Sequence, residues 1–350
     1  MKKMTYIMLC MTLLLLSACD VHEWPEPPEY AKLHLRLNYE TDMAEWNHTY
    51  DEDKEVVTEL GMGKTYDNHQ EYGKIRYIVR AYPTSEKQRA EQGKVQEFTF
   101  TKDISEGYDH RVTLDVLPGS YNIMVWSDLV ETSNDAYFYD AEDFAEIMLQ
   151  GTHRANTDHR DAFRGTNSIS LMTDMKERQP DTLDIEMQRP LAKYEFVTND
   201  VAEFIDKEST RVNSKSATSE DAPTRAVKLE DYKVVFYYIG FMPHAYSIYT
   251  DKPVDSSTGI IFESTLKELN DSEASMGFDY IFTNGTESAV TVQIGIFDQE
   301  DTRISLTAPI EVPIRRSHHT ILKGRFLMTE ASGGVYVNPE YDGDHNVIFP

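Results

Sequence analysis

The chain has 350 residues, enough for two ordinary domains, and 40% of them are hydrophobic, so most of the chain is expected to bury a core. Sixty Asp and Glu residues against 34 Lys and Arg residues give a formal net charge of −26, which excludes nucleic acid as a partner and attachment to anionic lipids by charge alone. The two cysteines, Cys10 and Cys19, exclude a disulfide framework and Cys-rich metal sites.

Residues 1–18 have the pattern of an export signal. Lys2 and Lys3 precede an apolar run, Tyr6–Leu16, that is too short to cross a bilayer. The run ends in Leu16, Ser17, Ala18 and Cys19, which resembles the lipoprotein box of bacteria, where a Cys follows the cleavage point and its sulfur carries diacylglycerol. An ordinary secretory signal with an incidental Cys is the alternative. We therefore expect Cys19 to be the lipidation site.

Cleavage before Cys19 would remove 18 residues and leave 332, and the loss of Lys2 and Lys3 would shift the charge by two, to −28. Acyl chains on Cys19 would hold this acidic chain to the lipid of the outer membrane. Residues 19–30 contain three prolines and four acidic residues, which predicts an extended tether. Acidic residues just behind the lipidated Cys favour the cell surface, with inner-membrane retention as the alternative.

The first half, residues 31–189, reads as a β-domain. Lys32–Tyr39 alternates between Leu33, Leu35 and Leu37 on one face and polar side chains on the other. The other strands expected in this half are Ile75–Tyr82, Val95–Thr101, Arg111–Val116, Tyr121–Trp126, Ser168–Met172 and Thr182–Met187.

Between these strands the sequence predicts less regular segments. Residues 41–73 are polar and are expected to form a long excursion from the sheet. Pro118 and Gly119 predict a turn at Leu117–Ser120. A helix is expected at 140–148, with Asp140 as its N-cap.

The second half, residues 190–350, repeats the β pattern. Its expected strands are Leu191–Thr198, Tyr232–Ile239, Tyr246–Tyr249, Phe278–Phe282, Ala289–Phe297, Ile304–Leu306, Ile310–Ile314, His319–Leu327 and Val347–Phe349. Asn199 is expected to cap a short helix, and 263–269 to form another. Residues 207–226 lose their bulky apolar side chains, which predicts a flexible loop. The fold class expected is all-β: two tandem antiparallel β-sandwich domains with short helices.

Four segments, in this order along the chain, resemble the FimB-like fimbrial anchor lipoproteins of Bacteroidetes, which are related to the fimbrillins. They are Leu117–Tyr121 with Val125–Asp128, Tyr137–Asp140 with Arg160–Phe163, Met187–Lys193, and His319–Leu327 with Gly333 and Gly334. The resemblance implies two transthyretin-like sandwiches that serve as an anchor or accessory subunit of a fimbria, without catalysis. Within the segments, Trp126 is expected in the core, and Arg189 is a candidate for bonding carbonyls at the domain junction.

The resemblance also bears on assembly. Stalk subunits of the related family are cut after an early Arg, which frees a groove for a neighbour's strand. Here the tether from Cys19 to Ala31 contains no Arg or Lys, and Lys32 and Arg36 lie in an expected strand. An uncut chain stays attached to its lipid, and fimbrial subunits would then join by strand addition at a sheet edge. Val347–Phe349 is either a donor strand or the closing strand of its own domain.

Motifs for chemistry are absent from the sequence. His159, Arg160 and Asp161 imitate a kinase loop without the other kinase motifs, and His318 and His319 point to opposite faces of a strand. No metal, cofactor or enzyme activity is predicted. Asp181, Thr182 and Leu183 resemble a Bacteroidetes O-glycosylation site, although Thr182 also suits a strand.

The alternative function is a surface glycan-binding lipoprotein of a polysaccharide-utilisation system. Such a protein needs exposed aromatic side chains on which sugar rings stack. With three Trp and 21 Tyr, the sequence allows this, and Trp46 is the residue whose substitution would test it.

Overall fold

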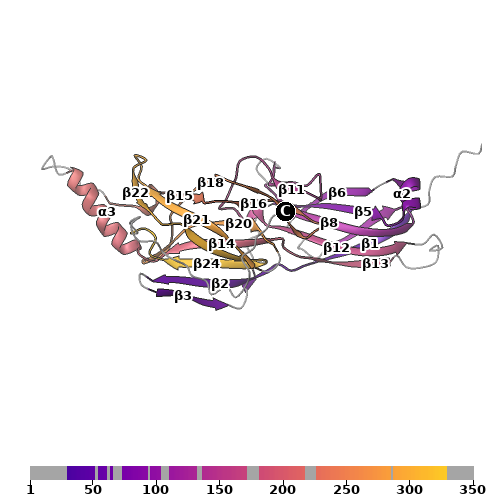
Figure 1. Ribbon diagram of the computed structural model, residues 1–350, viewed down its shortest axis with the longest axis horizontal. Coiled ribbons are helices and arrows are strands. Elements are labelled where there is room, and N and C mark those ends of the chain that lie inside the picture. Colours follow the sequence, from indigo (N-terminus) through magenta and orange to yellow (C-terminus); the bar gives the residue numbers. More distant parts are fainter. Residues whose placement is uncertain are drawn as a thin grey trace, which may run out of the picture.

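The structure is a computed structural model, and it describes residues 30–51, 54–60, 64–65, 73–93, 95–103, 110–131, 136–171, 181–216, 226–284 and 287–328. The fold is all-β, with sheets packed face to face and few helices. Figure 1 shows an elongated molecule, with α2 near one end and α3 at the other.

The first half is a sandwich of a three-stranded and a larger sheet. Leu33, Leu35 and Leu37 are fully buried between them, as the alternation predicts. The smaller sheet contains β13 (Asp181–Met187), β1 (Ala31–Tyr39) and β7 (His110–Val116), in that order. The larger contains β12 (Ala162–Leu171), β8 (Gly119–Glu131), β5 (Lys74–Pro83) and β6 (Gln96–Asp103), with β9 (Ala136–Tyr137) beside β8.

The second half packs two more sheets around an aromatic core that includes Tyr194, Phe196, Phe236 and Phe326. One sheet contains β19 (Lys267–Asn270), β20 (Glu273–Phe282), β14 (Leu191–Thr198), β24 (His318–Gly324), β2 (Asp42–Asp51) and β3 (Lys54–Leu60), with β4 (Lys64–Thr65) beside β2. The other contains β18 (Ile261–Thr265), β15 (Lys233–Tyr238), β21 (Glu287–Phe297), β22 (Arg303–Leu306) and β23 (Ile310–Arg315).

A small third layer joins the halves. It contains β10 (Tyr139–Asp140), β11 (Ile147–Leu149), β16 (Met242–Ser247) and β17 (Lys252–Ser257), so a strand from the first half pairs with one from the second. Trp126 and Tyr139 from the first half pack in one buried cluster with Tyr246 and Phe282 from the second. The helical segments are α2 (Glu86–Gln92), η3 (Asp158–Arg160), α3 (Val201–Ser216) and η5 (Leu229–Asp231).

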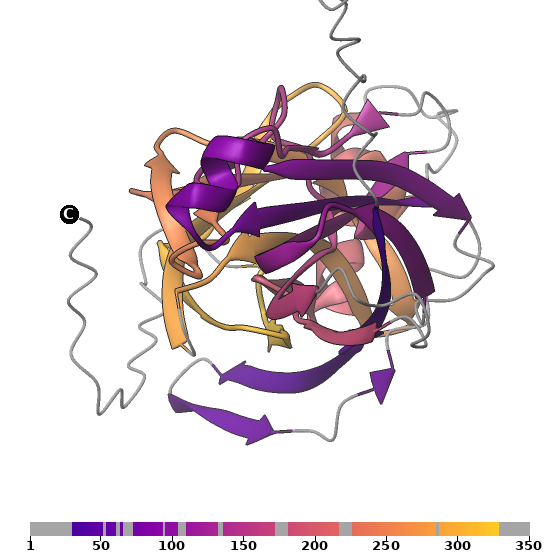
Figure 2. The ribbon, with the colours of Figure 1, turned by 90° about the vertical axis from the view of Figure 1, so that its right-hand side faces the viewer.

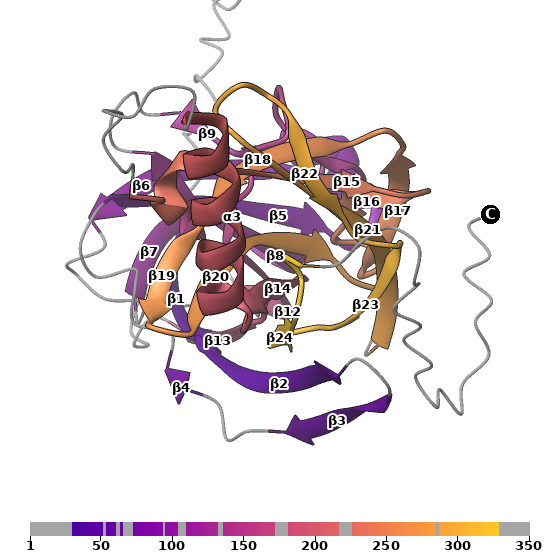
Figure 3. The ribbon, with the colours of Figure 1, turned by 90° about the vertical axis from the view of Figure 1, so that its left-hand side faces the viewer.

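Three strand pairs are parallel, which the sequence did not predict. β1 pairs with β13, and β24 pairs in parallel with both β14 and β2. The segment of β2 and β3 thus crosses from the first half to the sheet of the second, and both end views show it along one side of the molecule (Figures 2 and 3). The polar composition of 41–73 gave no sign of these strands. Their place in the sheet depends on β24, which lies far along the chain. The domain boundary at 189/190 stays a prediction.

The helix expected at 140–148 is wrong. The Asp140 carboxylate accepts from the Glu142 N–H at 3.0 Å, and the Asp143 carboxylate accepts from the Ala145 N–H at 2.8 Å. These local bonds form turns in place of a helix, so that Phe144 and Ile147 can both enter the cluster between the halves.

Two further expectations, a helix and a loop, also need correction. Residues 263–269 lie in β18 and β19, because Phe262 stacks on Phe236 with their ring centroids 4.4 Å apart and holds β18 against β15. The flexible loop expected at 207–226 is wrong for residues 207–216, which belong to α3, and residues 217–225 lie outside the described residues. Glu208 fixes the helix by accepting from the Tyr232 hydroxyl at 2.9 Å, which the local composition does not reveal.

Candidate functional site

The predicted lipidation site, Cys19 with Leu16, Ser17 and Ala18, lies outside the described residues, as do Gly333, Gly334 and the strand expected at Val347–Phe349. Lipidation of Cys19 therefore stays a prediction. The described chain begins at Tyr30, which is 57% exposed, and enters β1 at the next residue. Whatever Cys19 holds would thus be connected to the fold through β1.

β1 is the central strand of its sheet. It pairs in parallel with β13 from Leu33 to Tyr39 and antiparallel with β7 from Ala31 to Leu37. Its inward leucines are buried in the first core. On its outer face, Lys32 bonds Asp115 at 3.1 Å, and Arg36 makes a two-pronged contact with Asp184. That contact holds the pKa of the Asp184 carboxyl below its usual value. Ladders and side chains therefore hold β1 from both sides.

Arg189 holds the chain where it leaves β1. Its guanidinium donates to the carbonyls of Glu40 at 3.4 Å, Thr41 at 2.9 Å and Asp42 at 3.3 Å. Its Nε bonds the Asp161 carboxylate at 2.7 Å, and both side chains are fully buried. The sequence prediction that Arg189 bonds carbonyls at the junction is confirmed. A planar guanidinium with five donors suits this task, because it can satisfy a carboxylate and a turn together.

A second buried network ties the two halves together. Arg160 in η3 contacts the carboxylate of Asp279 in β20 and donates to the Tyr280 carbonyl at 2.7 Å. The Asp279 carboxylate also meets His153 at 2.7 Å and accepts from the Tyr238 hydroxyl at 2.6 Å. Burial alone would raise the pKa of Asp279, but the charge of Arg160 and the bond to His153 hold it below its usual value.

These networks give the kinase-like triplet of residues 159–161 a structural role. Arg160 and Asp161 are neighbours in sequence but enter different networks, one with Asp279 and one with Arg189. Tyr139 donates its hydroxyl to the Arg160 carbonyl at 2.5 Å, so the backbone of the triplet is held as well. The arrangement fixes the junction of the halves and buries the side chains of Arg160 and Asp161.

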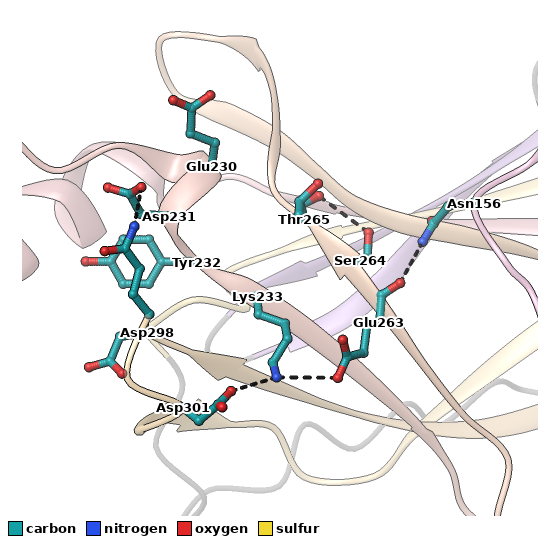
Figure 4. A pocket seen from close by; sticks show the side chains of 11 residues that line it. Asn156, Glu230, Asp231, Tyr232, Lys233, Glu263, Ser264, Thr265, Asp298 and Asp301 are labelled. Carbon is teal, nitrogen blue, oxygen red and sulfur yellow. Dashed lines mark hydrogen bonds and ion pairs between the residues drawn. The ribbon is translucent and has the colours of Figure 1, made fainter.

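A surface hollow of about 530 Å³ lies at the start of β15, beside η5 and β18 (Figure 4). Lys233 points between Asp301, at 2.7 Å, and Glu263, at 3.4 Å, and these bonds raise its pKa. The Asp298 carboxylate accepts from backbone N–H groups of its own loop. The hollow is rich in carboxylates, so it would repel anions, and its lysine already bonds two of these carboxylates.

The aromatic platform needed for a glycan is not found at the tryptophans that the structure describes. Trp126 is fully buried, which confirms its expected place in the core. Trp46 is 9% exposed and packs at 4.8 Å between ring centroids against His48. Neither can stack on a sugar ring from solvent, so substitution of Trp46 would test the core and not a binding surface.

The other expected residues lie apart from one another. His318 packs near Trp46, whereas the His319 ring meets Glu195 at 3.2 Å, so they face opposite sides of β24, as predicted. Thr182 is exposed on β13. Among the described residues, no group of three or more His, Cys, Asp or Glu side chains could hold a metal ion, and no helix is long and apolar enough to cross a membrane.

Several described strands have a partner on one side only. The ends of the sheets are β3, β6, β7, β10, β12, β13, β17, β18, β19 and β22. The edge of β18 is partly occupied, because the Asn156 amide donates to the Glu263 carbonyl at 3.3 Å. The remaining edges present backbone donors and acceptors of the kind that an added strand uses.

The fold and the junction define a β-sandwich protein with two halves, in which buried charged side chains hold the halves together. Residues 27–350 match a family described as a family of unknown function, DUF6562, and the chain belongs to this family. No curated protein matches the chain.

Three solved structures are similar to this chain. A candidate cell adhesion protein from Bacteroides eggerthii has 11% identity and a TM-score of 0.44, over 89% of this chain and 91% of that one. A candidate adhesin from Bacteroides ovatus has 11% identity and a TM-score of 0.43, over 89% and 94%. The fimbrial anchor protein Mfa2 from Porphyromonas gingivalis has 11% identity and a TM-score of 0.35, over 79% and 82%.

Proposed function

We propose that this protein is a lipid-anchored subunit of a fimbrial system on the cell surface. Acyl chains on Cys19 insert into the outer membrane, and the acidic body stands off the bilayer on the tether of residues 19–30. The protein acts as an anchor or accessory subunit and binds fimbrial partners by β-strand addition. It does so without catalysis.

The observation that carries this proposal is the way β1 continues the tether into the fold. The sequence between Cys19 and Ala31 contains no Arg or Lys, and Lys32 and Arg36 lie within β1. Because β1 is paired on both sides, these two basic residues are poor sites for a protease that cuts after Arg or Lys. The chain thus keeps its connection to the lipid, which an anchor requires.

Strand addition is supported by the free edges of the sheets. Edges at β6 and β7 lie in the first half, and β17 and β22 offer edges in the second. A partner's extended segment can bond such an edge through its main chain, and its side chains then provide specificity.

The proposal is tested in the native cell with two cysteine variants. Cys19→Ala should abolish labelling by radioactive palmitate, remove the protein from the outer-membrane fraction and release fimbriae into the medium. Cys10→Ala is the matched control, because this residue is discarded with the signal, and it should leave labelling unchanged.

The fimbrial part of the proposal has its own test. Fimbriae purified from cells that carry the unaltered gene should contain this protein, and its deletion should change their attachment or length. If fimbriae never contain the protein and deletion leaves them unchanged, the proposal is wrong. Specific binding on a glycan array would then favour the glycan-binding alternative.

A further inference from the structure

An anchor carries tension, and the geometry of β1 determines how the fold meets it. Ala31 pairs with Val116 at the end of β7, and Ser120, near the start of β8 that follows, donates its backbone N–H to the side chain of Gln88 in α2. β1 therefore begins at the end of the molecule near α2 and runs along the long axis to Arg189 at the junction (Figure 1). Tension applied through the tether is directed along β1.

A strand pulled along its own axis is loaded in shear. The hydrogen bonds on both sides of β1 lie across the direction of pull, so they must break together and not one after another. The same displacement would drag the buried side chains of Leu33, Leu35 and Leu37 through the core. Peeling β1 sideways from its N-terminal end would instead break one pair at a time.

The residues that follow β1 also limit how far the strand can move. β1 is already extended, so it cannot slide toward the tether unless residues 40–42 follow it. Arg189 donates to the carbonyls of all three of these residues, and the buried Asp161 holds Arg189. Beyond them, β2 is paired with β24 in the second half. Load on β1 is thus shared by its two ladders and by the Arg189 contacts.

We propose that β1, held in shear between β13 and β7 and stopped at residues 40–42 by Arg189, is a load-bearing clamp. The source of the load rests on the proposed anchoring function, whereas the clamp itself is a property of the fold. The clamp resists a pull directed along the tether and yields to a pull directed across the sheet.

Single-molecule pulling on the purified mature chain tests the clamp. One handle is placed at the N-terminus, and Cys19 is replaced by Ala so that one introduced Cys is the only thiol. Glu186→Cys places the second handle at the C-terminal end of β13, which loads β1 in shear. Thr182→Cys places it on the same exposed face at the N-terminal end of β13, which peels β1 away.

At equal loading rates, the Glu186 handle should give a rupture force at least about twofold higher than the Thr182 handle, because forced unfolding depends on the barrier that the pull meets. Equal rupture forces in the two geometries would overturn the clamp. Both handles lie four residues apart on one strand of the same folded protein, so a difference in stability does not explain the result.

Arg189→Lys tests the stop, because Lys keeps the charge beside Asp161 but loses the planar fork. The variant should lower the rupture force with the Glu186 handle and leave it unchanged with the Thr182 handle, since peeling starts far from Arg189. An equal loss in both geometries would contradict a stop at Arg189. Should the variant fail to fold, the comparison of the two handles decides alone.

The two proposals can fail separately. The pulling experiment uses protein without lipid, so a weak clamp would leave the anchoring proposal standing. Loss of palmitate labelling has no bearing on the rupture force.

Discussion

Single buried charges hold the junction of this protein. Arg160 is 2% exposed and Asp279 is fully buried. Each charge has lost its contact with water, and the ion pair between them compensates for that loss. Removal of one partner leaves an uncompensated charge in a medium that solvates it poorly. The same reasoning applies to Arg189 and Asp161.

Arg160→Met should therefore lower the free energy of unfolding by roughly 3–5 kcal/mol, because it leaves the Asp279 carboxylate without its principal cation. Urea denaturation followed by circular dichroism measures the change. Arg111→Met, on the exposed face of β7, is the control and should leave the unfolding midpoint near that of the unaltered protein. Similar midpoints for the two variants would show that the buried pair is not needed.

The burial of His48 predicts that the stability of the fold depends on pH. It is 4% exposed in β2, neither ring nitrogen has a hydrogen-bond partner among the residues that the structure describes, and burial lowers its pKa from 6.5 to about 4. Between pH 6.5 and 4 the unfolded chain binds the proton and the folded chain does not, so stability is retained above this window and lost as the pH falls through it.

The loss from His48 should be on the order of 2 kcal/mol between pH 6.5 and 4. His48→Leu should remove this part of the pH dependence, because Leu suits the apolar surroundings and does not titrate. Urea midpoints at pH 7, 5.5 and 4.5 measure the slope. His34→Gln, at the outer face of β1, should keep the slope of the unaltered protein. An unchanged slope in His48→Leu would assign the acid sensitivity to other groups.

At this scale the sequence predicted some groups and missed their partners. Arg189 could be proposed from its place before Pro190 at a change of domain, but Asp161 and residues 40–42 could not be paired with it. Asp279 gave no signal, because one acidic residue among 60 is not distinctive. Burial of such a residue depends on contacts between distant segments, which composition does not contain.

At the scale of the element, alternation was the reliable signal. Leu191–Thr198 was predicted with the bounds that β14 has, and Lys32–Tyr39 differs from β1 by one residue. The helix predictions failed where a short apolar spacing was satisfied by turns or by strand pairing, as at 140–148. β2 was missed because its alternation is interrupted by polar side chains, and because its parallel partner strand starts only at His318.

Gly277 in β20 gives a prediction at this scale. Its φ is +143°, and an added Cβ would lie 2.8 Å from Ser264 Oγ, 2.9 Å from Asn156 Oδ1 and 3.0 Å from a ring carbon of Phe236. Gly277→Ala should therefore lower the free energy of unfolding by about 1–3 kcal/mol, because strand and side chains must shift.

Gly259 is the matched control for this variant. Its φ is +69°, but an added Cβ would meet no atom within 4 Å. Gly259→Ala should therefore lower the free energy of unfolding by only about 1 kcal/mol, which is the cost of placing a side chain on a backbone with positive φ. Thermal denaturation of both variants measures the difference. A smaller loss for Gly277→Ala than for Gly259→Ala would show that the crowded position relaxes freely.

At the scale of the whole molecule, the halves are joined more closely than two domains on a linker. They share the third layer, the cluster around Trp126 and Phe282, and the pair of Arg160 and Asp279. We expect one cooperative unfolding transition, with calorimetric and van't Hoff enthalpies that agree. Scanning calorimetry measures both enthalpies. Two resolved transitions would show that the halves unfold independently.

The pairing of β2 with β24 also determines when the chain can fold. Ala44 pairs with His318, so 274 residues separate the two partners in sequence. During synthesis, β2 can pair with β3 at once, but its pairing with β24 must wait until almost the whole chain has emerged, and contacts of such long range form slowly. The sheet of the second half consequently stays incomplete until its last strands have been made, which would keep this part of the chain threadable for the export that we propose.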